Sequence, residues 1–357
     1  MHKFKNINCI KIENPLLGDC DTQMWAYRGI TALYSRNNQF DLLEFDKTSP
    51  TELIRDIGAP ADFSAYRYHG HFMEGHIDYW FPLDQAQDCV VFAGYTHQIQ
   101  YPNNVLSIGF DRFDFWVHEI FSNPVLYNEI NRAGVEHAEY DVCIPVGYYR
   151  THRQIFLQYL VDAQTNLKIV TDSRQTVLPT TLTFDSLNME PYLNKLVIDK
   201  FECHITHQSF YEFAPLGLMQ MPHRRMHAAC RVNVALETTV YETTQPYLTE
   251  KTYKILAQAR PFVIYGDTNI LQKLKTKGFK TFGQFCDESY DQEPNHDLRA
   301  KKVVDALQQL VTACHTHPEE INNICKFNQN HYFSQERLHN ELADFGQLCL
   351  DKVFIRS

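Results

Sequence analysis

Tyr247-Leu-Thr-Glu-Lys251 lies between two apolar segments, Arg231-Val-Asn-Val-Ala-Leu236 and Pro261-Phe-Val-Ile-Tyr265. Both flanking segments are short and rich in β-branched residues, which predicts buried strands. Thr249 is a good N-cap residue, so we expect a helix over residues 250–259. Strand, helix and strand in this order predict a parallel sheet. The start of the helix then lies at the carboxyl edge of the sheet, where α/β proteins bind ligands.

The same pattern precedes this stretch and begins near residue 140. The sequence predicts strands at 140–146 and 167–171, with a helix over 154–163 between them. A basic turn, Arg150-Thr-His-Arg153, joins the first strand to the helix. This βαβ unit extends the predicted parallel sheet toward the N-terminus.

The rest of the chain also alternates between strands and helices, so the predicted fold class is α/β, with two Rossmann-like domains facing across a cleft. We place the domain boundary at about residue 139, which gives domains 1–139 and 140–357. Further strands are predicted at 40–45, 88–93 and 105–110, and further helices at 49–58, 113–131, 269–277, around 303–311 and from Leu338 onward.

Composition narrows the classes of function and compartment. The formal net charge of −10 argues against broad, non-specific contact with nucleic acid or anionic lipid. We expect no secretory signal at the N-terminus, and no apolar run approaches the roughly 20 residues of a membrane helix. The 10 cysteines form no C-x-x-C pair, which favours free thiols over zinc ligands or disulfides. We therefore expect a cytoplasmic protein.

The start of the predicted helix carries the chemistry. A helix N-terminus presents unpaired N–H groups and a positive dipole end, which together favour phosphate. Lys251 in the first turn opposes the helix dipole, and a bound diphosphate would offset that cost. Glu250 can accept hydrogen bonds from both ribose hydroxyls. The alternative is an ordinary solvated helix start.

An ordered series of motifs resembles known glycosyltransferases. Val234-Ala-Leu-Glu-Thr-Thr239, Tyr247-Leu-Thr-Glu-Lys251 and Arg260-Pro-Phe-Val-Ile-Tyr-Gly266 resemble the donor-binding signature of the alpha-1,3-fucosyltransferases. Lys277-Gly-Phe-Lys-Thr-Phe282 and Asp287-Glu-Ser-Tyr-Asp291, together with Arg150-Thr-His-Arg153, resemble proteins of phages and marine bacteria that are classed as glycosyltransferases. The resemblance covers residues 140 to about 312, half of the chain.

The resemblance implies a GT-B fold, with acceptor binding in 1–139 and nucleotide-sugar binding in 140–357. It also implies that the last helix packs back on the N-terminal domain. Within the donor site it assigns Glu250 to the ribose and Lys251 to a phosphate, beside Thr249 and Glu237. Thr238 stands where the fucosyltransferase pattern has Asn, so the donor sugar stays open. Proteins of this fold usually need no metal, so no cofactor is expected.

Further charged residues are candidates for the same site. Glu242 and Glu250 have the Glu-x7-Glu spacing of many retaining glycosyltransferases, in which the first Glu faces the reacting sugar. Phosphate contacts are expected from Arg150, Arg153, Arg224, Arg225 and Arg231, and an arginine offsets charge as a diphosphate leaves. For Arg224 and Arg225 the alternative is a solvated loop. Asp287, Glu288 and Asp291 either bind a cation or, as we favour, form a turn that caps the following helix.

The N-terminal half contains one cluster of titratable residues, Tyr68-His-Gly-His-Phe-Met-Glu-Gly-His-Ile-Asp78. Glu74, His76 and Asp78 are the candidates for the base that deprotonates the acceptor. The alternative is a chance cluster, because the chain contains 17 histidines.

The leading hypothesis is a glycosyltransferase that moves a sugar from a nucleotide-diphosphate sugar to a saccharide or other hydroxyl-bearing acceptor. One alternative is a metal-dependent hydrolase that uses His69, His71 and His76 as zinc ligands. Another is a non-catalytic nucleotide-sugar-binding protein. Nucleic acid is not an expected partner, and any contact with it would run through Arg224, Arg225 and Arg231.

Overall fold

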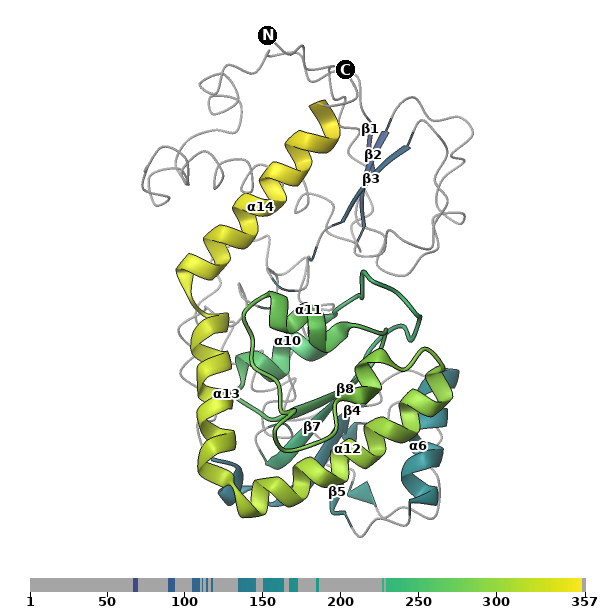
Figure 1. The fold of residues 1–357 in the computed structure, drawn as a ribbon, viewed down its shortest axis with the longest axis vertical. Coiled ribbons are helices and arrows are strands. Elements are labelled where there is room, and N and C mark those ends of the chain that lie inside the picture. Colours follow the sequence, from purple (N-terminus) through teal and green to yellow (C-terminus); the bar gives the residue numbers. More distant parts are fainter. Residues whose placement is uncertain are drawn as a thin grey trace, which may run out of the picture. The chain divides into compact units, whose positions relative to one another are not determined.

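Contacts within the chain divide the computed structural model into two units, residues 1–112 with 334–357, and residues 113–333. The structure describes strands at 67–69, 89–93 and 105–109, residues 111, 114, 117 and 227, and the ranges 134–145, 150–163, 167–172, 184–185 and 229–354 (Figure 1). The protein is mixed α/β with parallel sheets. The predicted domain division at residue 139 stays a prediction.

The first unit contains a small parallel sheet of strands β1 (Arg67–His69), β2 (Cys89–Ala93) and β3 (Val105–Gly109), in the order β1-β2-β3. Helix α14 (Gln335–Phe354) contacts β3. The predicted strands at 88–93 and 105–110 and the C-terminal helix are therefore confirmed. The strand predicted at 40–45 and the helix predicted at 49–58 lie outside the described residues.

The second unit contains a five-stranded sheet in which each neighbouring pair is parallel. Its strands are β4 (Tyr140–Pro145), β5 (Ile169–Asp172), β6 (Phe184–Asp185), β7 (Cys230–Leu236) and β8 (Phe262–Tyr265). The helices described with it are α6 (Thr151–Asp162), α10 (Glu250–Ala257), α11 (Ile270–Thr276), α12 (His296–Thr316) and α13 (Pro318–Tyr332), with 3-10 turns η3 (Val135–His137) and η4 (Ser289–Gln292).

The strand order of this sheet, β6-β5-β4-β7-β8, reverses direction at its centre. The chain moves outward from β4 to β5 and β6, then returns so that β7 lies beside β4 and β8 beyond it. Right-handed crossovers in opposite directions place α6 and α10 on opposite faces of the sheet. Helix α12 contacts α6, and α13 contacts α10, so both faces are covered. The carboxyl ends of β4 and β7 therefore lie side by side.

Buried apolar residues explain why the second unit folds in this way. The two central strands are buried on both faces, as shown by the adjacent buried pairs Val142 and Cys143 in β4 and Val234 and Ala235 in β7. The helices that cover them bury apolar stripes at helical spacing, with Phe156, Leu157 and Leu160 in α6 and Val303, Leu307 and Leu310 in α12. No helix among the described residues is both long enough and apolar enough to cross a bilayer.

The predicted elements 140–146, 167–171, 231–236, 250–259, 261–265 and 269–277 are all present, within a few residues at each end. One boundary was wrong. Helix α6 begins at Thr151, so the basic segment predicted as a turn forms its N-cap, Arg150, and its first helical residues. Of the helix predicted over 113–131, the structure describes Asp114 and Val117, both of which are helical.

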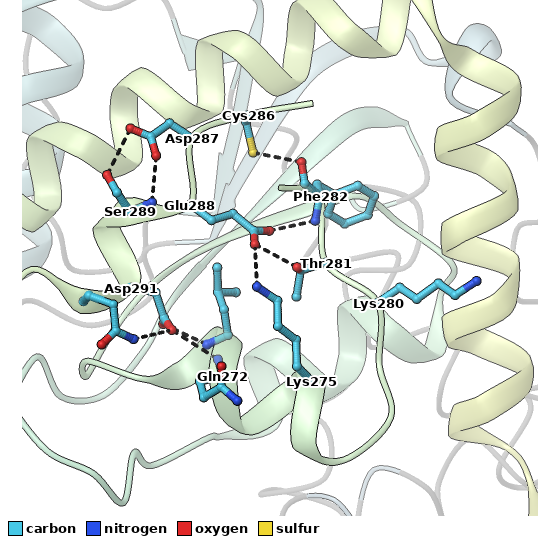
Figure 2. Close-up of polar contacts among 12 residues, drawn as sticks. Gln272, Lys275, Lys280, Thr281, Phe282, Cys286, Asp287, Glu288, Ser289 and Asp291 are labelled. Carbon is cyan, nitrogen blue, oxygen red and sulfur yellow. Dashed lines mark hydrogen bonds and ion pairs between the residues drawn. The ribbon is translucent and has the colours of Figure 1, made fainter. Parts of the chain in front are cut away.

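The motif Asp287–Asp291 folds the loop between α11 and α12 (Figure 2). Asp291 accepts hydrogen bonds from the backbone N–H groups of Leu271 (2.8 Å) and Gln272 (3.1 Å), so it caps the first turn of α11. Helix α12 is instead capped by Asn295, which accepts from two N–H groups of its first turn. The motif therefore does cap a helix, as predicted. The capped helix is α11, which precedes the motif, and not the following helix α12.

Glu288 of the same motif holds the other side of the loop. Its carboxylate accepts hydrogen bonds from the Phe282 N–H at 2.7 Å, the Thr281 hydroxyl at 2.8 Å and the Lys275 ammonium at 2.9 Å (Figure 2). Asp287 accepts from both the N–H and the hydroxyl of Ser289. All three carboxylates are thus bonded to residues of the loop or of helix α11.

Replacing Asp291 with alanine leaves two backbone N–H groups of α11 without their partner. We expect Asp291→Ala to lower the free energy of unfolding by about 1–2 kcal/mol, as for loss of an N-cap. Urea denaturation of the full chain measures this value. Asp287→Ala is the matched control, because its bonds are exposed to solvent and its effect should stay within about 0.5 kcal/mol. Equal losses in the two variants would contradict the capping role.

Candidate functional site

The end of β7 and the start of α10 are joined by one buried carboxylate. Glu237 directly follows β7 and is fully buried. One of its oxygens accepts hydrogen bonds from the Thr249 N–H at 3.1 Å and the Thr252 hydroxyl at 2.6 Å. The other accepts from the Thr249 hydroxyl. Glu237 thereby fixes the first turn of α10 against the end of β7.

Burial raises the pKa of Glu237, while the charge of Lys251 and the hydroxyls of Thr249 and Thr252 oppose that shift. Because both oxygens are occupied by Thr249 and Thr252, the carboxylate holds the first turn of α10 in place. The sequence had grouped Glu237 with the donor-binding residues, and its observed contacts are all with the protein.

The exposed side of this turn carries an ion pair. The Lys251 ammonium lies 3.1 Å from a Glu250 carboxylate oxygen and 3.1 Å from the Thr249 hydroxyl oxygen. The side chains of Glu250 and Lys251 are 16% and 22% exposed, so both reach the surface while most of their atoms are packed. Thr249 is the N-cap of α10, as the sequence predicted.

Partial burial by itself would raise the pKa of Glu250, but the charges of Lys251 and Lys254 outweigh burial and lower the pKa to about 2. Lys254 is buried behind them. Burial lowers the pKa of Lys254 to about 8, against the opposing effect of Glu250. At neutral pH this turn therefore contains an ionised carboxylate that is paired with the Lys251 ammonium and lies near the charge of the buried Lys254.

A second helix start meets the same edge of the sheet. His152, in the first turn of α6, has its Nε2 atom 3.0 Å from the carbonyl oxygen of Glu237. Burial lowers the pKa of His152 to about 4, and the nearby charges of Arg150 and Arg153 act in the same direction. The imidazole is therefore neutral at pH 7, and its Nε2–H donates to this carbonyl. This bond joins the residue that follows β7 to the first turn of α6, at the point where the strand order of the sheet reverses.

The loop between β7 and α10 is fixed by a residue that sequence analysis missed. Asp267, which follows β8, accepts hydrogen bonds from the Tyr241 N–H at 2.7 Å and the Tyr247 N–H at 3.0 Å. Arg299 of α12 donates to the carbonyl oxygens of Gly266 and Glu293, and so connects α12 to the residue after β8 and to the loop before α12. The available signal was an acidic residue two positions after a buried strand, at the carboxyl edge of the sheet.

The structure gathers some predicted site residues and separates others. Thr249, Glu250, Lys251 and Glu237 lie at one helix start, and the His152 bond brings the α6 turn with Arg150 and Arg153 to the same edge. Arg153 is buried, whereas Glu242 is exposed in the loop after β7.

Arg231 is placed outside the candidate site, which corrects the sequence prediction. It is the second residue of β7, at the amino edge of the sheet, and pairs with Asp141 at 2.9 Å. Because strand β7 separates it from the helix start, Arg231 cannot contact the same phosphate. Glu74, His76, Asp78, His71, Arg224 and Arg225 lie outside the described residues, and His69 is described only as part of β1.

Among the described residues, no group of three or more His, Cys, Asp or Glu side chains is placed to hold a metal ion. No known family model matches the sequence, and comparison with curated proteins finds no match. The functional argument therefore rests on the geometry of the site.

Glu237→Gln replaces an oxygen that accepts with an amide that donates, so Thr249 or Thr252 loses its acceptor. We expect the free energy of unfolding to fall by about 1–3 kcal/mol, the usual range for a buried unsatisfied polar group. Urea denaturation provides the measurement. The same substitution at exposed Glu242, in the neighbouring loop, should change stability by less than about 0.5 kcal/mol. An unchanged Glu237→Gln variant would argue against the anchoring role.

The low pKa of His152 predicts a pH dependence. Between pH 6.5 and about 4 the unfolded chain binds a proton at His152 that the folded chain does not, so stability falls as the pH drops through this window. His152→Gln retains an N–H donor but cannot titrate. Its free energy of unfolding should therefore depend on pH less steeply, by about one proton. Urea titrations at several pH values test this, and equal slopes would refute it.

Proposed function

We propose that this protein is a glycosyltransferase that moves a sugar from a nucleotide-diphosphate sugar to a hydroxyl-bearing acceptor. The observation that carries the proposal is the turn Thr249–Lys251, held by buried Glu237 where the strand order reverses between β4 and β7. Open α/β sheets bind ligands outside the carboxyl ends of their strands at such a reversal, and this order is that of nucleotide-binding, doubly wound sheets.

The chemistry of the turn matches the two polar parts of a nucleotide diphosphate. The Lys251 ammonium and the N–H groups of the α10 first turn bind the diphosphate. Glu250 is ionised, and its two oxygens accept hydrogen bonds from the two ribose hydroxyls. The charge of the buried Lys254 helps to keep Glu250 ionised and adds positive charge near the proposed phosphate site.

The start of α6 supplies a second source of positive charge. Arg150 is the N-cap of this helix, its side chain forms no capping hydrogen bond, and the first turn contains no acidic residue. With Arg153 it offsets the charge that develops on the diphosphate as the bond to the sugar breaks. The motif series shared with glycosyltransferases supports the same assignment.

In the proposed reaction the acceptor oxygen attacks the anomeric carbon, and the bond from that carbon to the nucleotide diphosphate breaks. The acceptor hydroxyl gives its proton to a base. Glu74, His76 and Asp78 remain the proposed base candidates, and Glu242 is the carboxylate proposed to face the sugar. Two Rossmann-like domains in a GT-B arrangement, with the acceptor on the N-terminal side, form part of the same proposal.

Donor binding tests the proposal directly. We expect one class among UDP-, GDP-, ADP-, CMP- and dTDP-sugars to raise the melting temperature of the full chain. Lys251→Ala should weaken binding of the matching nucleoside diphosphate about tenfold or more, and leave binding of the nucleoside unchanged. Glu250→Ala should remove the preference of the protein for the ribonucleotide over its 2′-deoxy analogue. Isothermal titration calorimetry measures all three effects.

Glu319→Ala, an exposed change in the first turn of α13, is the control and should bind like the unchanged protein. The proposal fails if no nucleotide sugar stabilises the protein, or if both site variants bind as tightly as this control. Donor binding without hydrolysis or transfer would indicate a non-catalytic binding protein.

A further inference from the structure

The second unit contains a groove of about 760 Å³ between helix α12 and the loop after Phe282. Its floor and one wall are formed by a face of α12 that includes Gln308, Gln309, Thr312 and Thr316. Gln284 and Phe285 form the other wall. The groove is open to solvent, because six of its nine lining residues are exposed.

The groove is separate from the candidate donor site. Helix α12 begins at the carboxyl edge of the sheet, where the carbonyl of His296 accepts a hydrogen bond from the Tyr265 hydroxyl at 3.1 Å. It ends near the amino edge, where the His315 imidazole lies 3.8 Å from Asp141, the second residue of β4. The groove lies along the second half of this helix, away from Glu250 and Lys251.

The lining is polar but nearly uncharged. Carboxamides and hydroxyls dominate it, and Asp305 supplies a carboxylate. No lysine or arginine is among the described residues that line the groove. A phosphate, a sulfate or a nucleic acid would therefore meet no permanent positive charge there, which disfavours anionic ligands.

Carboxamides match sugar hydroxyls because both groups donate and accept hydrogen bonds. The Gln309 carbonyl oxygen already accepts from the Asp287 N–H at 2.7 Å, which fixes the carboxamide and leaves its NH2 group to donate. Within the described residues, the side chains of Gln284 and Gln308 form no hydrogen bond, so both retain their full capacity for a ligand.

Phe285 adds an apolar surface to this polar lining. Its ring is partly buried and lies 5.7 Å from the His317 ring, at an angle of 48°. An aromatic face packs against the C–H groups of a pyranose ring. One aromatic ring beside several carboxamides offers a neutral saccharide both an apolar contact and hydrogen bonds.

The wall that carries Phe285 is fixed before a ligand binds. The Phe285 N–H donates to the Phe282 carbonyl at 2.8 Å, and the Phe282 N–H is held by Glu288 (Figure 2). The motif Asp287–Asp291 therefore orders the wall of the groove that contains Phe285, through the bond from Phe282 to Glu288. A fixed wall lowers the entropic cost of binding.

We propose that this groove is a binding site for neutral oligosaccharides. The site goes beyond the proposed function, because it requires neither the nucleotide-sugar donor nor sugar transfer. The Phe285 ring stacks on one sugar, and the carboxamides of Gln284, Gln308 and Gln309 hydrogen-bond to hydroxyls of the same sugar or its neighbour.

A glycan array tests this proposal with the full chain. The array displays neutral gluco-, manno- and galacto-oligosaccharides beside sialylated and sulfated glycans. We expect binding to a subset of the neutral oligosaccharides. In titrations with the best of them, Phe285→Ala and Gln308→Ala should each weaken binding about tenfold. Leu298→Ala, an exposed change at the other end of α12, should bind like the unchanged protein.

Thermal unfolding of each variant shows whether it is folded, and Gln308→Ala keeps the test decisive if Phe285→Ala is not. Binding to sulfated or sialylated glycans alone would overturn the proposal, as would the absence of any bound neutral glycan. Equal affinity of the groove variants and Leu298→Ala would also overturn it. Glu250→Ala should retain glycan binding, so failure of this site and failure of the donor site are distinguishable.

Discussion

The buried carboxylate of Glu237 is the constraint on which the edge of the second unit depends. An ionisable group without contact to water is costly unless its hydrogen bonds are complete, and here three donors from Thr249 and Thr252 complete them. The residues that supply these donors form the first turn of α10. Strand β7 can therefore bury its end only with that turn in place, and this fixes the positions of Glu250 and Lys251 relative to the sheet.

The same logic extends to the neighbouring elements at this edge. His152 satisfies the backbone carbonyl of Glu237, and Asp267 satisfies two backbone N–H groups of the loop between β7 and α10. Each of these buried polar groups comes from a different strand–helix junction. The edge of the sheet is therefore held by a connected set of hydrogen bonds, and a ligand would meet a surface that is already ordered.

Local signals explain which parts of this arrangement the sequence predicted. Strands β7 and β8 and the Thr249 cap depend on neighbouring residues, and all were predicted. Helix α13 was not, because its buried positions include Asn328 and Gln329 beside a few apolar residues, which weakens the apolar stripe. The roles of Glu237 and Asp291 depend on partners 12 and 20 positions away, and pairing over such distances is set by tertiary structure.

Helix α12 links the two sites that we propose in this unit. From its first turn near β8 to the middle of the groove it rises about 1.5 Å per residue over some 14 residues, a distance of about 20 Å. We therefore expect the sugar that reacts at the α10 helix start to be a different one from the sugar bound in the groove. A longer chain of the same polymer, held in the groove, would keep its other end at a high effective concentration near the enzyme. If both proposed sites are correct, the groove would increase retention of a polymeric acceptor, and the proposed donor site would determine which sugar is added.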